Sequence, residues 1–278
     1  MTIKSSLPRL EWLTVRRNGF EYRLPFLFRK GTTGPALLFI HGLGGAKENF
    51  YAAYQSPALA DCDLLSFDFP GTGLAEFDAE SCADVSTLAE ITHLVRSALL
   101  PGPAFLVAAS MGGLVALLLL RRFGASNVLG VVNIEGNLAP EDCMFSRRTA
   151  SRTLAEFSGE LFPQMQAELR ASRYPGDHMI AHNMALNTDV RAYHQYSFET
   201  VRESDSGRLL DEFIELPMPR MFLYGEANRA LSYLPRLRAS QVDVREIPGS
   251  AHFLFYDNPV VTFEEIATFV RTAERVQG

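Results

Sequence analysis

A serine between a buried apolar stretch and two glycines is the first candidate for chemistry in this sequence. Residues 105–113 read FLVAASMGG, so Ser110 follows a strand-like run and precedes an apolar helical pattern. A serine on such a sharp strand-to-helix turn is exposed at the carboxyl edge of a sheet, and small neighbours let the backbone bend. Ala108 replaces the first glycine of the G-x-S-x-G pattern, a small-for-small change. We predict a nucleophilic serine; the alternative is a serine that caps an ordinary helix.

A histidine near the end of the chain is the candidate base. His252 lies in the segment PGSAHF, which follows a strand-like run. A loop there would hold the imidazole over the edge of the sheet, where its Nε2 can remove the proton of Ser110. The other histidines fit packing or surface positions better, in a core helix for one and in a helical insertion for three: His93, His178, His182 and His194.

A glycine-rich segment after an earlier strand can supply backbone donors. Residues 40–45 read IHGLGG, and the glycines permit a turn that points a backbone N–H into the site. We expect the amides of Leu43 and Met111 to form an oxyanion hole together. Met111 also begins a helix, whose positive end favours negative charge. We expect His41 to brace the loop by hydrogen bonding.

A second glycine pair has a different interpretation. Residues 68–73 read DFPGTG, which could imitate a phosphate loop. The lysine that such a loop needs to reach a phosphate is missing. We therefore interpret this segment as a turn.

These residues need a scaffold that brings several strand ends to one edge. The pair Asn18-Gly19 separates two strand-like runs and predicts a tight hairpin. Short apolar runs, each followed by a stretch of helical length, then predict a mostly parallel sheet. The expected strands are Leu10–Arg16, Phe20–Phe28, Ala36–Ile40, Asp63–Phe67, Ala104–Ala108, Val128–Ile134, Arg220–Tyr224 and Val242–Ile247.

The alternation of strands and helices stops in the middle of the chain. Residues 139–216 show helical patterns at 151–157 and 164–172, interrupted by Pro163 and Pro175-Gly176. We expect a helical cap there, inserted into a core made of residues 1–138 and 217–278. The segment from Pro259 to Val276 predicts an amphipathic closing helix.

Composition excludes several other classes of function. The formal net charge is −6 and long Lys/Arg runs are missing, which argues against nucleic-acid binding. The thiols Cys62, Cys82 and Cys143 lack metal-site spacing and suit a reducing compartment. The first twenty residues lack the pattern of a secretory signal, and Leu114–Leu120 is too short for a bilayer of ~30 Å hydrocarbon. We expect a cytoplasmic protein without membrane or metal partners.

The ordered set of motifs resembles one family. H-G-L-G-G, D-F-P-G-T-G, A-A-S-M-G-G and G-S-A-H-F, on this pattern of strands, are similar to the motifs of the α/β-hydrolase family. The resemblance covers nearly all of the chain except the cap. It implies an α/β fold with an eight-stranded, mostly parallel sheet and helices on both faces. It also implies a site under the cap, a Ser-acid-His triad and no cofactor.

The acid departs from the family pattern. The usual aspartate follows the strand that ends at Tyr224, but here the sequence reads Gly225-Glu226-Ala227-Asn228, and an amide cannot stabilise imidazolium. Glu135 ends the preceding strand, which is similar to the position of the acid in haloalkane dehalogenases. We therefore expect Glu135 to be the acid, with Glu226 as the alternative.

These residues predict a serine hydrolase of small-molecule substrates. Ser110, His252 and Glu135 would cleave a carboxylic ester, thioester or lactone through an acyl-serine intermediate. One alternative is hydrolysis of a carbon–carbon bond beside a ketone, which relatives perform with the same triad. Another is a ligand-binding protein on this fold. Aromatic residues of the cap predict a mostly apolar pocket: Phe145, Phe157, Phe162, Tyr174, Tyr193, Tyr196 and Phe198.

Overall fold

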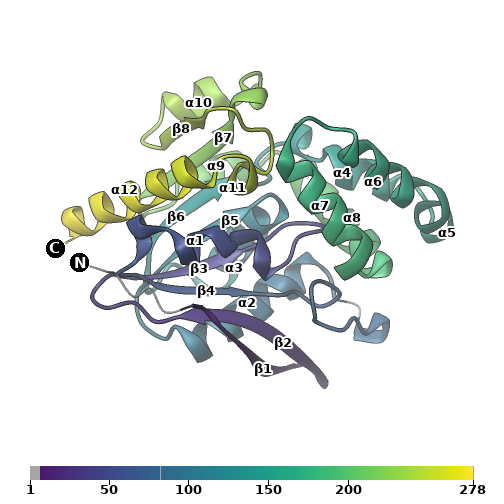
Figure 1. Ribbon diagram of the computed structural model, residues 1–278, viewed down its shortest axis with the longest axis horizontal. Helices are drawn as coiled ribbons and strands as arrows, with labels where there is room; N and C mark the ends of the chain where they lie inside the picture. The colour runs from purple at the N-terminus through teal and green to yellow at the C-terminus, as the bar shows by residue number, and fades with distance from the viewer. Residues whose placement is uncertain (1–6, 82, 278) are drawn as a thin grey trace.

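A computed structural model describes residues 7–81 and 83–277 and contains a single eight-stranded sheet (Figure 1). The strand order is β1-β2-β4-β3-β5-β6-β7-β8. The strands β1, β2 and β4 pair antiparallel, and the pairs from β4 to β8 are parallel. The mostly parallel sheet predicted from the sequence is therefore confirmed. The strands are β1 Arg9–Arg17, β2 Phe20–Arg29, β3 Ala36–Ile40, β4 Asp63–Phe67, β5 Ala104–Ala109, β6 Val128–Ile134, β7 Arg220–Gly225 and β8 Asp243–Ile247.

The first two strands form the hairpin expected from the Asn-Gly pair. Asn18 and Gly19 have φ angles of 50° and 84°, and Arg17 pairs directly with Phe20 across the turn. Two consecutive positive φ angles match the right-handed twist of a two-residue hairpin. The hairpin then joins the sheet through the pairing of β2 with β4.

Helices cover both faces of the sheet. One apolar core includes Leu88 of α2 and Leu114 of α3, while the other includes Phe50 of η1 and Phe263 of α12. In Figure 1, α12 crosses in front of the strands. The helices outside the middle of the chain are η1 Lys47–Phe50, α1 Tyr51–Gln55, η2 Pro57–Leu59, η3 Ala79–Ser81, α2 Val85–Leu99, α3 Met111–Phe123, η6 Glu226–Asn228, α10 Leu234–Arg238, α11 Leu254–Asp257 and α12 Pro259–Gln277.

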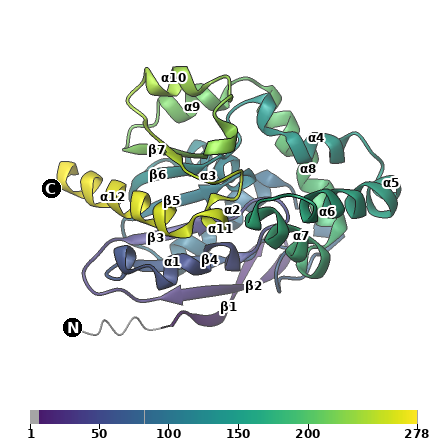
Figure 2. The same cartoon turned by 45° about the horizontal axis from the view of Figure 1, so that its top comes forward.

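Residues 139–216, here called the inserted segment, form helices between β6 and β7. Figure 2 shows α4 to α8 gathered at one end of the sheet. The helices are η4 Pro140–Asp142, α4 Met144–Ala150, α5 Leu154–Glu156, η5 Phe157–Leu161, α6 Phe162–Arg170, α7 Pro175–Asn187, α8 Val190–Asp205 and α9 Leu209–Ile214.

Two sequence-based boundaries in the inserted segment are wrong. The helix expected from residue 151 begins at Leu154, because Thr153 caps it: the Thr153 hydroxyl accepts from the Glu156 N–H at 3.3 Å. Pro163 does not interrupt the helices, since it lies in the first turn of α6. The π-helical turn η5 directly precedes α6. Such a wider turn accommodates Pro163, which lacks an N–H donor.

The longest apolar run lies in the core. Leu114–Leu120 is part of α3, a helix of 13 residues, and all the residues of this run are buried. In the described ranges, no helix is both long and apolar enough to cross a membrane. Cys62 and Cys143 are buried free thiols, whereas Cys82 lies outside the described residues.

Candidate active site

Ser110 occupies a strained turn between β5 and α3. Its backbone has φ 53° and ψ −128°, a conformation that costs a non-glycine residue about 1–3 kcal/mol. Hydrogen bonds hold it there: the Ser110 N–H donates to the Ile134 carbonyl at 3.0 Å, and the Gly113 N–H donates to the Ser110 carbonyl at 2.8 Å. The residue remains partly exposed. The turn thus presents a hydroxyl at the carboxyl edge of the sheet.

Glycines after the serine permit close packing. A Cβ atom on Gly112 would lie 2.3 Å from the Ile40 carbonyl oxygen, and one on Gly113 would lie 2.7 Å from the Gly136 Cα. Both distances are shorter than van der Waals contact. The first turn of α3 can therefore approach β3 and the end of β6 only with glycine at these positions.

The loop after β3 lies directly against Ser110. A Cβ on Gly42 would lie 2.7 Å from the Ser110 Cβ and 3.2 Å from the Met111 nitrogen. The Gly42 carbonyl accepts from His41 Nδ1 at 2.9 Å and from the Gly45 N–H at 3.1 Å. That carbonyl belongs to the same planar trans peptide as the Leu43 N–H, so holding the oxygen fixes the direction of the N–H.

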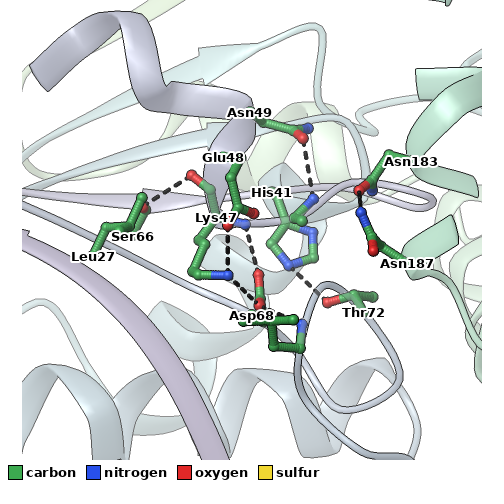
Figure 3. A network of polar contacts seen from close by, with 12 residues as sticks. Leu27, His41, Lys47, Glu48, Asn49, Ser66, Asp68, Thr72, Asn183 and Asn187 are labelled. Carbon is green, nitrogen blue, oxygen red and sulfur yellow. Dashed lines mark hydrogen bonds and ion pairs between the residues drawn. The ribbon is translucent and has the colours of Figure 1, made fainter. Parts of the chain in front are cut away.

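His41 is a buried, neutral brace for this loop. The Phe69 N–H donates to His41 Nε2 at 3.2 Å, and Thr72 Oγ1 also lies 3.2 Å from this nitrogen (Figure 3). Burial lowers the pKa of His41 to about 4. The ring therefore stays uncharged at neutral pH, with the proton on Nδ1, as the bond to the Gly42 carbonyl requires.

A buried ion pair joins the loop after β3 to the turn after β4. Lys47 Nζ donates to Asp68 Oδ2 at 2.8 Å, and the Lys47 N–H donates to Asp68 Oδ1 at 2.7 Å (Figure 3). The Leu74 N–H donates to Asp68 Oδ2 at 2.9 Å. Both charged side chains are almost fully buried. The DFPGTG segment is a turn, as expected, but its aspartate also anchors the neighbouring loop.

The structure brings Glu135 and His252 together. His252 Nδ1 lies 2.8 Å from Glu135 Oε2, and the side chains are 14% and 5% exposed. Glu135 follows β6 with φ 43°, and its N–H donates to the Leu223 carbonyl at 2.9 Å. A proton on Nδ1 leaves Nε2 as the free acceptor of the ring.

Glu226 and Asn228, in the turn after β7, have different hydrogen-bond partners. Asn228 Nδ2 lies 2.9 Å from Glu135 Oε1 and 2.7 Å from Oε2. Glu226 instead accepts from the Gly249 N–H at 2.8 Å, and its side chain is 43% exposed. The carboxylate that contacts the imidazole is therefore that of Glu135.

Neighbouring charges raise the pKa of His252. Burial acts to lower this pKa, but the hydrogen bond and the charge of Glu135 outweigh it, with further contributions from Asp142 and Asp177. The imidazolium is consequently more favourable here than in water. A base placed in this way holds a proton readily during a reaction.

The hydroxyl of Ser110 and the ring of His252 are not directly linked. In the part of the chain that the structure describes, no hydrogen bond joins Ser110 Oγ to His252. Both residues stand at the same sheet edge, because Ser110 follows β5 and Glu135 follows the adjacent β6. In serine hydrolases this bond is often loose before substrate binds.

The inserted segment contacts the loop after β3. Gly44 has φ +67°, and a Cβ on it would lie 2.8 Å from Met184 Cγ and 3.4 Å from Tyr193 Cε2. Asn183 Nδ2 donates to the Gly44 carbonyl at 2.5 Å. Helices α7 and α8 therefore lie over the loop that carries Leu43.

The aromatic residues of the inserted segment divide into two groups. Tyr193 packs against Phe157 and Phe162 with ring centroids 5.5 and 5.6 Å apart. Tyr196 is buried and donates to the Pro70 carbonyl at 2.8 Å, while Phe198 is 48% exposed. Of the aromatic residues expected to line an apolar pocket, Tyr196 therefore fixes the inserted segment to the core and Phe198 faces outward.

Three contacts at this site were not predicted from the sequence. They involve Lys47, Asn183 and Asn228. Asn183 stands in α7 without any motif around it, and the H-G-L-G-G motif that ends two residues before Lys47 gives no signal for an ion pair. Only Asn228 had a signal, since it occupies the place where the family pattern has its acid.

Comparison with known proteins identifies the family. A family model described as "Alpha/beta hydrolase family" matches residues 37–265, which is most of the chain. This chain belongs to the α/β-hydrolase family. A sequence search of curated proteins finds no match.

Solved structures share the fold of this α/β-hydrolase. A thermophilic esterase from Thermogutta terrifontis has 21% identity and a TM-score of 0.73, with 95% of this chain and 99% of that chain covered. The N-acyl homoserine lactonase AidH has 16% identity and a TM-score of 0.75, with 95% and 98% covered. The epoxide hydrolase CorEH has 16% identity and a TM-score of 0.74, with 95% and 99% covered. At these identities the likeness establishes the fold alone.

Proposed function

We propose that this α/β-hydrolase cleaves a carboxylic ester, thioester or lactone through an acyl-serine intermediate. Ser110 is the nucleophile, His252 the general base and Glu135 the acid that orients the imidazole. The observation that carries the proposal is the 2.8 Å contact between His252 Nδ1 and Glu135 Oε2, at the sheet edge that presents Ser110. The esterase and lactonase activities named for the structural neighbours support this class of substrate.

In the acylation half of the reaction, His252 acts first as a base and then as an acid. Ser110 Oγ attacks the carbonyl carbon while His252 Nε2 takes its proton. The amides of Leu43 and Met111 stabilise the oxyanion, and Glu135 stabilises the imidazolium. The bond from the carbonyl carbon to the leaving oxygen or sulfur then breaks, and His252 gives its proton to the leaving group.

Deacylation repeats these steps with water. His252 Nε2 removes a proton from water, the resulting hydroxide attacks the acyl carbon, and the bond to Ser110 Oγ breaks. His252 then returns its proton to Ser110, which releases a carboxylic acid.

We further propose that residues 139–216 act as a cap over this site. The contacts of Met184 and Tyr193 with Gly44 support this role. A second contact supports it at the histidine loop, because a Cβ on Gly176 would lie 2.7 Å from the Phe253 Cβ. Substrate selection by the cap would then depend on side chains of α7 and α8.

A fluorophosphonate probe and a substrate panel test the proposal. The panel contains p-nitrophenyl esters of increasing length, acyl thioesters and lactones. Parent protein should be labelled at Ser110, and Glu135→Gln should lower kcat by a few orders of magnitude, since replacing the triad aspartate of a serine protease by asparagine costs about 10⁴-fold. Labelling at another residue, or parental turnover by Glu135→Gln together with collapse of Glu226→Gln, would contradict the assignment.

A further inference from the structure

Asn228 occupies the position after β7 from which an acid is expected, and its side chain points to the acid that replaces it. Nδ2 of Asn228 lies within hydrogen-bond distance of both oxygens of Glu135. We infer that Asn228 is a positioning residue, which holds the Glu135 carboxylate in the orientation that His252 requires. The inference rests on the proposed function, because it assigns Asn228 a role through Glu135.

The acceptors of Glu135 are shared among three donors. Oε2 lies 2.8 Å from His252 Nδ1 and 2.7 Å from Asn228 Nδ2. Oε1 accepts from the Gly225 N–H at 2.7 Å and lies 2.9 Å from Asn228 Nδ2. The amide of Asn228 therefore bridges the two oxygens, and the carboxylate cannot rotate without losing at least one of these bonds.

The position of Glu135 in the backbone explains why its carboxylate needs hydrogen-bond donors from the end of β7. Glu135 follows β6 and reaches across to the end of the neighbouring strand β7, where Gly225 meets it. Glutamate has one more rotatable bond than aspartate, so its carboxylate is less restricted by its own backbone. The donors at the end of β7 compensate by fixing the carboxylate at the far end.

The chemistry of the amide suits this role. Asn228 supplies donors without charge and leaves the Glu135 carboxylate as the single acidic group bonded to His252. A second carboxylate at this position would face Glu135 at hydrogen-bond distance, and two carboxylates so close cannot both ionise readily. Asparagine thus donates to the Glu135 carboxylate without adding a second carboxyl group that would share a proton with it.

The side chain of Asn228 has no other task in the described part of the chain. Its hydrogen bonds there are those to Glu135, while its backbone carbonyl accepts from the Leu231 N–H at 3.2 Å. The residue is partly exposed in the short turn η6. Replacement should therefore affect the carboxylate more than the fold.

Two substitutions separate positioning from a merely structural role. Asn228→Leu keeps similar volume and removes the donor, whereas Asn228→Asp keeps the shape and adds a carboxylate. Glu226→Gln is the matched control in the same turn, since Glu226 contacts Gly249 and not Glu135. The readouts are kcat, KM, the rate of fluorophosphonate labelling and the pH dependence of kcat/KM, each with a check of folding.

We expect Asn228→Leu to lower kcat and the labelling rate about ten-fold, the equivalent of one hydrogen bond to a charged group, with KM unchanged. We expect Asn228→Asp to lower kcat as well, because two carboxylates at this distance share a proton and no longer hold Glu135 as a pure acceptor for His252. The other ionisable groups that face this cluster stay the same in both variants: Asp142, Asp177, Tyr233 and Asp257.

The outcomes distinguish this role from the proposed function. If both Asn228 variants fold and keep the parental kcat while Glu135→Gln collapses, the triad stands and the positioning role is wrong. A raised KM with parental kcat would also overturn it, since that pattern indicates substrate binding. If Glu135→Gln itself keeps parental activity, the proposed acid is wrong. If Asn228→Leu fails to fold, Asn228→Ala, which removes the same donor, decides through kcat and the rate of fluorophosphonate labelling.

Discussion

The side chain of Asn183 in α7 donates a hydrogen bond to the carbonyl of Gly44, one residue after Leu43 in the loop that follows β3. Asn183 is 9% exposed, so this bond is shielded from water. Since Gly44 also lies against Met184, the inserted segment and the loop form one packed unit. We therefore predict that the orientation of the Leu43 amide depends on Asn183, 140 positions further along the chain.

Replacing Asn183 by leucine tests this dependence. The substitution leaves the buried Gly44 carbonyl without that donor, which costs about 1–3 kcal/mol. We expect a similar loss in the free energy of unfolding and a clear fall in the fluorophosphonate labelling rate. His182→Leu is the control, because His182 is an exposed residue of the same helix. Labelling of Asn183→Leu at the parental rate would show that the loop keeps its shape alone.

We expect the strained backbone at Ser110 to lower the free energy of unfolding of the protein. We expect Ser110→Gly to abolish labelling and to raise the free energy of unfolding by about 1 kcal/mol, because glycine adopts φ 53° without strain. Ser110→Ala should abolish labelling without this gain, since alanine keeps the strained Cβ. Urea unfolding of the three proteins measures the difference. Equal stability of the glycine and alanine variants would argue against strain at this turn.

The pH dependence should follow His252. The base must be neutral, so kcat/KM should rise with pH through the pKa of His252 in the free enzyme. Because Glu135 raises this pKa, the rise should lie above the value of an ordinary histidine, ~6.5. Glu135→Gln should move the remaining activity to lower pH. If kcat/KM of Glu135→Gln rises at the parental pH, the rise is due to the titration of a group other than His252.

We expect a substitution at His41 to lower kcat and to leave the pH at which kcat/KM rises unchanged. Its pKa of about 4 keeps it neutral across the working range. His41→Leu removes a donor from the Gly42 carbonyl and an acceptor from the Phe69 N–H, so kcat should fall. The apparent pKa of kcat/KM should stay at the parental value. Disappearance of the rise of kcat/KM with pH in this variant would make His41 the base.

The buried pair of Lys47 and Asp68 should be sensitive to loss of one partner. Asp68→Asn leaves the buried ammonium of Lys47 with the half-exposed Glu48 as its remaining counter-ion among the described residues, which should cost up to about 3–5 kcal/mol. Urea unfolding should show a loss of this size. Glu168→Gln, which breaks the exposed pair with Arg148, should change stability by less than about 1 kcal/mol. Similar losses in both variants would mean that the Lys47 charge is well solvated.

Sequence patterns predicted the strands well, because buried strands are short apolar runs bounded by turns. The expected Asp63–Phe67 and Val128–Ile134 agree with β4 and β6 to the residue, and the Asn-Gly hairpin is present. The eight-stranded sheet followed from the family resemblance. The helix boundaries near Pro163 were not predicted, since a π-helical turn has no simple sequence signal.

Local motifs indicated the candidate site only where the residues lie on strand ends. Ser110, Glu135 and His252 each follow a strand, so their order along the chain already suggested a common edge. The contact of Asn183 with Gly44 joins residues from different layers, and the buried Lys47 depends on a carboxylate across a loop. Such contacts depend on three-dimensional packing and cannot be inferred from spacing along one chain.

The inserted segment leaves the sheet after β6 and returns to it at β7, and these two strands are direct neighbours. Its two ends are therefore held close together by the core, whatever happens between them. Lengthening such a loop costs little free energy, because the closure entropy grows only slowly with length. On the proposed role of this segment as a cap, insertion, deletion or exchange within residues 139–216 would change substrate preference while the sheet keeps its strand ends in place.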